Sequence, residues 1–211
     1  FIGNLNLRGG DAYGDSGGTT RWSITGIDLG LTSRSIGASI GDQGRWLIGI
    51  GYDELRHNLT DTYQTPYLGT MGGNSFTLPP GFGVNANANA LTAAQQAAFR
   101  NLDVSSTRKN TSLSAALILS PQWELKFDFN HLDQSGAKLM GFGSMQRPVT
   151  GGTVTAEYVS ILPNPTQYKT DTLNMAANWT GEQAHLSATY FGSFFRDGVD
   201  RVTFQTWAGA N

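Results

Sequence analysis

The sequence predicts an all-β fold, an antiparallel meander of long strands that each have one apolar and one polar face. Residues 123–130 show the pattern best, because apolar side chains at the odd positions alternate with charged or amide side chains at the even positions. A period of two is typical of a β-strand with two chemically different faces. Residues 111–120 alternate in the same way, and only Pro121 and Gln122 separate the two segments, which indicates a tight hairpin.

The composition excludes several other classes of protein. The 211 residues include 27 glycines and no cysteine, and only 39% are hydrophobic, which does not resemble a packed α/β enzyme. Without cysteine the chain has no disulfide framework, thiolate metal site, cysteine nucleophile or covalently attached c-type haem. A net charge of −2 gives no bias towards nucleic acid. No apolar run approaches the roughly 20 residues of a membrane helix, and no signal peptide begins at Phe1.

Eight strands are expected along the chain, and residues 201–207 begin a ninth that has no partner. In residues 21–31 the apolar side chains change face after Gly26, and a β-bulge at this glycine would explain the change. Short connections, such as residues 42–44, join the strands as hairpins. The eight strands are expected at residues 1–8, 21–31, 34–41, 45–58, 111–120, 123–130, 173–179 and 184–196.

Two long loops, residues 59–106 and 135–170, interrupt this series. The first is too long for a passive connection in a compact domain, so it is expected to be functional or mobile. Within it, Thr92 and Gln95 form a capping box ahead of an alanine-rich turn that ends near Arg100. This pattern predicts one short surface helix near residues 92–100. The second loop is rich in glycine and proline.

One loop near the N-terminus contains two possible site motifs. Residues 14–18 spell the five residues around the nucleophilic serine of chymotrypsin-like proteases, but that mechanism needs a histidine base upstream in the chain. A calcium loop using Asp11 and Asp15 fits slightly better, although the EF-hand spacing and its closing glutamate are absent. The histidines are expected to be polar wall residues instead, and all three lie downstream of the serine: His57, His131 and His185.

The tryptophans indicate what the apolar faces contact. In an antiparallel meander the connections alternate between two edges, and every tryptophan falls beside a connection on the same edge. An aromatic girdle at a membrane–water interface explains this placement, whereas a soluble sandwich does not. With strands of about ten residues, the pattern predicts a transmembrane β-barrel of an outer membrane, and the usual loop asymmetry would put this edge on the periplasmic side. The expected interfacial belt is Trp22, Trp46, Trp123, Trp179 and Trp207.

The polar faces of the strands would then line the lumen of the barrel. An unpaired ninth strand would leave backbone groups unsatisfied in lipid, so residues 1–211 are expected to form a single segment of an incomplete barrel. An exported protein would also begin before residue 1. The side chains expected to face the lumen and to contact a partner there are Glu124, Lys126, Asp128, Asn130, Asn174 and Asn178.

Several short motifs resemble those of the MtrB/PioB family of decahaem-associated outer-membrane proteins. One is a Leu-Pro-x-Pro segment that leads through Tyr-x-Thr into a strand, although Thr166 and Gln167 stand where that family usually has an apolar residue and an aspartate. The resemblance runs from about residue 22 to residue 207. The residues that carry it are Thr65, Pro66, Tyr67, Leu78, Pro79, Leu162, Pro163, Pro165, Tyr168, Thr170, Ser193 and Phe194.

The resemblance implies part of a large barrel in the outer membrane of a Gram-negative bacterium. Members of that family sheathe a periplasmic multihaem cytochrome and hold it against an extracellular one, so the implied function is an insulating conduit and not catalysis. The haems would belong to the partner cytochrome, and this chain would bind no cofactor or metal. Two alternatives stay open: a general diffusion porin for small solutes, and an outer-membrane hydrolase for which His131 near Asp133 is the only indication.

Overall fold

The computed structural model describes residues 3–12, 18–82, 91–145 and 157–206. Strands dominate these residues and there is almost no helix, which confirms the predicted all-β class. The chain forms two compact units, and each is described by itself. Unit 1 consists of Phe1–Arg56, Thr107–Gln134 and Tyr168–Arg196, and unit 2 consists of His57–Ser106, Ser135–Gln167 and Asp197–Asn211.

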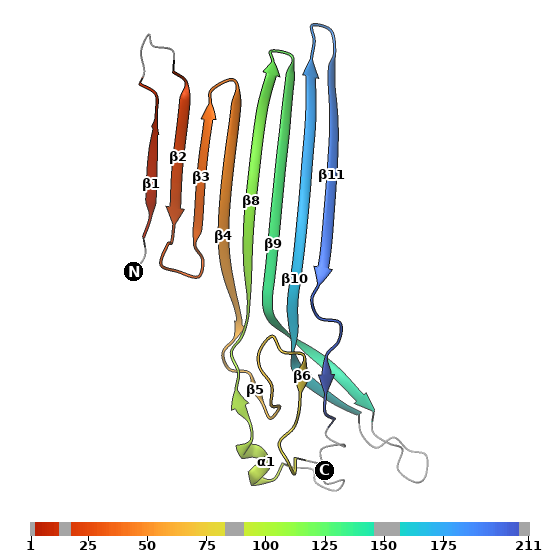
Figure 1. Cartoon of the computed structure of the whole chain (residues 1–211). Coiled ribbons are helices and arrows are strands. Elements are labelled where there is room, and N and C mark those ends of the chain that lie inside the picture. Colours follow the sequence, from red (N-terminus) through yellow and green to blue (C-terminus); the bar gives the residue numbers. More distant parts are fainter. Residues whose placement is uncertain (1–2, 13–17, 83–90, 146–156, 207–211) are drawn as a thin grey trace. The chain divides into compact units, whose positions relative to one another are not determined.

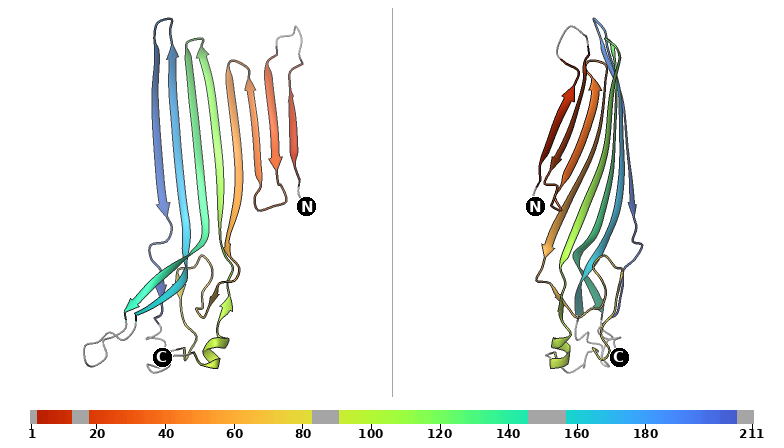
Figure 2. Two further views of the ribbon diagram at one scale, coloured as in Figure 1. Left: turned by 180° about the vertical axis from the view of Figure 1, so that it is seen from behind. Right: turned by 60° about the vertical axis from the view of Figure 1, so that its left-hand side comes forward.

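Eight strands form an antiparallel meander in the order β1-β2-β3-β4-β8-β9-β10-β11 (Figure 1). Figure 2 shows the same neighbours from two further directions. Within the described residues β1 and β11 are the two edges, so the sheet is open and does not close on itself. The strands are β1 (Leu5–Gly10), β2 (Thr20–Ile27), β3 (Ser35–Asp42), β4 (Trp46–Thr60), β8 (Val104–Ser120), β9 (Trp123–Met145), β10 (Glu157–Thr180) and β11 (His185–Asp197).

The register of the first strands gives the sheet of unit 1 one apolar and one polar face. Trp22 lies opposite Ile40, and Ile40 lies opposite Ile48, so these three side chains share a face. Ser23 and Ser39 also lie opposite each other, and their hydroxyl oxygens are 2.8 Å apart. Because side chains alternate along a strand, the serines are on the other side of the sheet. We call the side with Ile40 the apolar face and the side with Ser39 the polar face.

Both faces continue through the other strands of unit 1. A Cβ at Gly49, on the polar face of β4, would be 2.7 Å from the Ser114 hydroxyl oxygen on β8. On β9 and β10, Asn178 Nδ2 donates a hydrogen bond to Glu124 Oε2 at 3.2 Å. Alternation therefore puts the polar residues of β9 on one face and Phe127, with the other odd-numbered aromatic residues, on the opposite face.

The predicted β-bulge at Gly26 is wrong. Gly26 pairs with Ile36 of β3 in a register that runs without interruption to Ile27, where β2 ends. The chain then turns at Asp28, whose φ is +54°. The Leu29 side chain folds back over Gly26: a Cβ atom at Gly26 would lie only 2.9 Å from Leu29 Cδ1. The apolar side chains change parity because the strand has ended.

The predicted loop at residues 135–170 is also wrong, since most of it is strand. β9 continues to Met145 and β10 begins at Glu157. Residues 146–156, between the two strands, lie outside the described part of the chain. Glycine and proline usually interrupt strands, and their number here hid the pattern. Gly136 has a φ of +125°, and a Cβ there would overlap the carbonyl oxygen of Ser105. Glycine is therefore required for this close approach of two backbones.

Unit 2 contains the predicted loop at residues 59–106, which is folded around a hydrophobic core. Its buried residues are Tyr67, Phe76, Leu78, Phe82 and Leu162, and Ala98, Phe99, Phe142, Val202 and Phe204 pack against them. The other elements of unit 2 are β5 (Gln64–Thr65), β6 (Ser75–Phe76), α1 (Ala93–Ala97), β7 (Arg100–Asn101) and β12 (Thr203–Phe204). The predicted capping box of α1 is confirmed, with Thr92 and Gln95 each accepting from the other's backbone N–H, but the helix is a single turn.

The predicted ninth strand of the meander is wrong. Residues 203 and 204 form β12, which pairs in parallel with β6 of unit 2 and not with the main sheet. Val202 and Phe204 pack against the core of unit 2, and this packing decides where the segment lies. Trp207 lies outside the described residues. Among the residues that the structure describes, no helix is long and apolar enough to cross a membrane, a finding that concerns helices alone.

Candidate lumen wall and lipid-facing surface

Polar side chains connect neighbouring strands across the polar face of unit 1. Glu124 on β9 accepts the hydrogen bond from Asn178 on β10 and forms an ion pair with Lys126 at 3.0 Å. Asn178 Oδ1 in turn accepts a hydrogen bond from Ser187 Oγ on β11 at 2.7 Å. Three strands are therefore tied together by one row of side chains on this face.

A second row crosses from β4 to β9. Asn110 Nδ2 on β8 lies 3.4 Å from Asp53 Oδ1 and 3.4 Å from Asn130 Oδ1. Most of the predicted lumen residues thus belong to one of the two rows, while Asp128 and Asn174 share the same face by alternation and are exposed. The sequence reasoning missed Ser187, Asp53 and Asn110, because a single polar residue on a strand carries no signal of its partner.

Small side chains occupy one part of the polar face between β2 and β8. The Ser112 hydroxyl oxygen lies over Gly51, where a Cβ would be only 2.5 Å from it. Gly37 likewise lies under the Thr25 hydroxyl group, because a Cβ atom at Gly37 would be 3.2 Å from the Thr25 hydroxyl oxygen. Short hydroxyl groups over glycines leave this part of the face without long projecting side chains.

An open hollow of about 790 Å³ lies among the residues of unit 1 near the hairpin turns. Its lining includes the cations Arg8 and Arg21 and the carboxylate of Glu124. It also includes Leu47 and Ile118, whose side chains are 51% and 41% exposed. Leu47 lies opposite Gly41 in the register that places both on the polar face. This face therefore mixes both signs of charge with exposed apolar groups.

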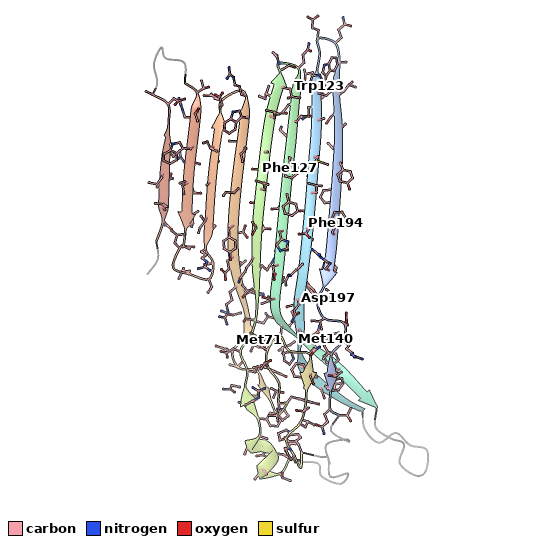
Figure 3. The ribbon with its side chains drawn as sticks, viewed as in Figure 1. Met71, Trp123, Phe127, Met140, Phe194 and Asp197 are labelled. Carbon is pink, nitrogen blue, oxygen red and sulfur yellow. The ribbon has the colours of Figure 1, made fainter. Side chains whose placement is uncertain are left out.

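Large side chains are exposed across the apolar face. Ile50 on β4 is 59% exposed and Phe194 on β11 is 58% exposed. Figure 3 shows Trp123 at the turn end of β9, with Phe127 further along the same strand. Exposed apolar surfaces of this extent mark contacts with a membrane or with another protein.

Four tryptophans lie beside turns at one edge of the sheet in unit 1. Trp46 and Trp123 are the first residues of β4 and β9, and Trp179 is one residue before the end of β10. The backbone N–H of Thr180 donates to Gln122 O at 2.8 Å, so antiparallel pairing sets Trp123 directly opposite Trp179. Trp22 is near the start of β2, beside the preceding connection. Their placement agrees with the predicted belt, whose contact with lipid stays a prediction.

Comparison with known proteins gives the family. Residues 3–211 match the model of a family described as "Putative outer membrane beta-barrel porin, MtrB/PioB". The chain belongs to the MtrB/PioB family. A curated relative, "Outer membrane protein MtrB" of Shewanella baltica (strain OS185), is 20% identical over 186 residues. The MtrB/PioB match confirms the resemblance inferred from the motifs and the location in the outer membrane.

The match includes 88% of this chain but only 25% of the length of the curated relative. An open sheet with two free edges fits such a segment of an MtrB/PioB barrel. MtrB/PioB is a porin-type outer-membrane family and not a known enzyme family.

Most of the MtrB/PioB motif residues are buried in unit 2. Tyr67 is 2% exposed, and its hydroxyl oxygen is 2.9 Å from Ser160 Oγ and 3.1 Å from Gln205 O. The guanidinium group of Arg100 donates to the carbonyl oxygens of Tyr67 and Gly69, a contact that the sequence reasoning missed. Also buried are Thr65, Pro66, Leu78, Leu162, Pro163 and Pro165, with Pro79 partly buried, whereas Tyr168, Thr170, Ser193 and Phe194 lie on β10 and β11 in unit 1.

Tyr63 makes a further contact with β10, next to the motif residues Leu162 and Pro163. Its hydroxyl group donates to Ile161 O on β10 at 2.5 Å. Burial raises the pKa of the Tyr63 phenol, which keeps the hydroxyl protonated as the donor. The MtrB/PioB motif therefore joins the loop at residues 59–106 to the start of β10, which is a structural role.

The histidines do not form a catalytic site in the part of the chain that the structure describes. His131 Nδ1 lies 2.5 Å from Asp171 Oδ1, and within residues 3–12, 18–82, 91–145 and 157–206 no serine hydroxyl is hydrogen-bonded to this ring. Asp133, the predicted neighbour of His131, instead faces Lys169 at 3.8 Å. His57 is exposed on β4, and His185 Nδ1, at the start of β11, lies 2.9 Å from the hydroxyl oxygen of Thr180 at the end of β10.

The described residues do not contain a complete site for either motif of the N-terminal loop, the protease-like sequence or the calcium loop. Asp11 Oδ2 accepts a hydrogen bond from the backbone N–H of Thr20 at 3.0 Å, which closes the loop. Asp15 and Ser16, which the calcium and protease interpretations need, lie outside the described residues. Among the residues that the structure describes, no three carboxylates or imidazoles are grouped as a metal site.

Proposed function

We propose that the full-length protein is an outer-membrane barrel that sheathes a multihaem c-type cytochrome and insulates its haems during electron transfer across the membrane. This chain would supply one part of the wall, with the polar face of unit 1 towards the lumen. The haems would be held by the partner, because this chain has no cysteine for covalent haem attachment. An extracellular cytochrome would receive or donate the electrons at the mouth of the barrel.

The mixed chemistry of the polar face carries this proposal. Leu47 and Ile118 are exposed in the hollow beside Arg21 and Glu124. In a water-filled channel these apolar side chains would stay wet, whereas a protein surface would bury them. The ion pair of Glu124 with Lys126 also leaves this part of the face without a field of one sign. A mixed surface of this kind suits a folded partner better than a stream of small ions.

The small residues support the same proposal. Hydroxyl groups cover Gly37, Gly49 and Gly51, so no long side chain projects from this region. A partner could then approach the backbone of the wall closely and exclude water between the two surfaces. Exclusion of water lowers the local dielectric around the haems, which is one of the factors that set their reduction potentials.

The second candidate is a general diffusion porin for small solutes. The description of the family as a porin favours it, and the same polar face would then line an open pore. The two candidates differ in what fills the lumen. A sheath holds a protein and conducts few ions, whereas a porin is filled with water.

A substitution on the polar face of the full-length protein tests the proposal. Ser39→Trp places an indole on the polar face, and we expect it to reduce the haem that co-purifies with each barrel by several-fold. Ala38→Trp places the same indole on the apolar face, and Ser39→Ala removes only the hydrogen bond to Ser23. Both controls should retain the partner. Haem at background level in the unsubstituted protein and in all three variants would favour the porin, whereas equal recovery above background would show that the partner does not contact the face bearing Ser39.

A further inference from the structure

A row of charged side chains crosses the apolar face of unit 1 far from the tryptophans. Arg34, which precedes β3, forms an ion pair with Glu54 on β4 at 2.7 Å. Lys109 on β8 interacts electrostatically with the same carboxylate. Asp133 on β9 and Lys169 on β10 form the next pair, at 3.8 Å. The sign of the charge therefore alternates from one strand to the next.

A second group lies one step along the strands from this row. Asp171 on β10 contacts His131 on β9 through Oδ1 and accepts a hydrogen bond from Arg196 on β11 through Oδ2, at 2.5 and 2.7 Å. These residues have the parity of the apolar side chains on their strands, so they share the apolar face. We call the three ion-paired groups, together with Lys109, the charge ladder.

The charge ladder and the tryptophans are separated by a constant distance along the chain. On β4, β9 and β10 the nearest ladder residue is eight positions from the tryptophan, which corresponds to roughly 26 Å along a strand and about 20 Å along the membrane normal at a usual tilt. The lipid-facing apolar band of an outer-membrane barrel is about 25 Å tall. The pairs are Trp46 and Glu54, Trp123 and His131, and Trp179 and Asp171.

Only uncharged side chains occupy the apolar face between these limits on the same three strands. They are Ile48, Ile50 and Tyr52 on β4, Leu125, Phe127 and Phe129 on β9, and Leu173, Met175 and Ala177 on β10. A charged side chain on a lipid face is most destabilising at the bilayer midplane and is nearly neutral at the interface. A row of charges at the end of an apolar band therefore belongs at the membrane surface.

The exposures within the ion pairs show which charge faces outward. The Arg34 side chain is 45% exposed and that of Glu54 is 11% exposed. The Arg196 side chain is 68% exposed, whereas that of Asp171 is 21% exposed. Lys169 is likewise more exposed than its aspartate. In each pair the cation is more exposed than the carboxylate, so the ladder presents more positive than negative charge outward, which complements the phosphates of lipid headgroups.

We propose that the charge ladder lies at the second membrane–water interface, so that the hydrocarbon of the bilayer contacts unit 1 only between the ladder and the tryptophans. The outward cations then face the layer of headgroup phosphates. This assignment depends on the location in the outer membrane and not on what the barrel encloses. It specifies how deeply each strand of unit 1 sits in the bilayer.

Spin-label accessibility in the full-length protein tests the assignment. Single cysteines at Ile50 and Phe127 report on the middle of the band, one at Lys109 reports on the ladder, and one at Ser39 reports on the polar face. The labelled protein is placed in vesicles of phosphatidylcholine and phosphatidylglycerol, and collisions with oxygen and with a nickel chelate are measured. Heat-modifiable electrophoretic migration identifies folded barrels, and Leu113 and Thr111 replace Ile50 and Lys109 if either variant does not fold.

The ratio of oxygen to nickel accessibility should be high at Ile50 and Phe127 and several-fold lower at Lys109. It should also be low at Ser39, because that residue is on the other face. Equal ratios at Lys109 and Phe127 would overturn the assignment, since the ladder would then lie inside the hydrocarbon. Free access of nickel to Ile50 and Phe127 would overturn it as well, because the band would not contact lipid.

Discussion

The two units of this chain differ in where they put their apolar side chains. In unit 2, residues such as Phe76 and Leu162 are at most 2% exposed and form a core. In the described part of unit 1 the buried positions are glycines, Gly26 and Gly41, while Ile50 and its neighbours are largely exposed. Unit 2 therefore follows the rules of a water-soluble domain, whereas unit 1 needs an apolar solvent that the chain does not supply. An outer membrane supplies it.

The largest effect should come from the core of unit 2. Phe76→Ala removes a buried ring and should destabilise unit 2 by about 3–5 kcal/mol. Hydrogen exchange on the full-length protein should show lost protection in residues 57–82, while β2 and β3 keep theirs. Leu68→Ala, at a position that is 45% exposed, is the control and should change little. Equal losses in both variants would mean that unit 2 has no core of its own.

The next effect should appear in unit 1 and should depend on the face. Phe127→Arg puts a cation in the middle of the apolar face and should destabilise the folded barrel in lipid by about 2–4 kcal/mol. Asp128→Arg places the same side chain on the polar face and should be much milder. Urea titration of folded protein in vesicles measures both. A larger loss of stability in Asp128→Arg than in Phe127→Arg would show that the two faces assigned to β9 are the wrong way round.

A smaller effect should come from the hydroxyl group of Tyr67. Tyr67→Phe removes its contacts with Ser160 and Gln205 but keeps the ring in the core, so a loss of about 1–2 kcal/mol is expected. The loss should be local to unit 2 by hydrogen exchange. Ser187→Ala removes a hydroxyl from the exposed polar face and should cost less. An unchanged unit 2 in Tyr67→Phe would show that packing alone holds the motif.

The strands of unit 1 could be predicted because each depends on local alternation. Residues 123–130 and their hairpin partner at 111–120 have regular periods and a short turn, and the structure contains both. Prediction was wrong where packing outside the strand decides. Gly26 looked like a bulge because the apolar side chains change parity at Ile27, where β2 ends and Leu29 folds back over Gly26. Phe204 is not part of the main sheet because it packs in the core of unit 2.

The candidate surfaces were predicted unevenly for the same reason. Glu124 and Asn178 could be assigned to a polar face from their own strands, but the hydrogen bond between them depends on the register of β9 and β10. The charge ladder could not be predicted, because His131 and Asp133 look like the polar end of a strand until their partners on β10 are known. Sequence alternation gives the face of a residue, and only the pairing of strands gives its neighbours.

The most direct test of the proposed sheath is the content of the intact barrel. The full-length protein would be purified from its native host in mild detergent, its haem absorbance measured, and the same fraction incorporated into planar bilayers. The proposal predicts a cytochrome in a fixed ratio to the barrel and little ionic conductance. An empty barrel that conducts ions freely would contradict it and identify a diffusion porin.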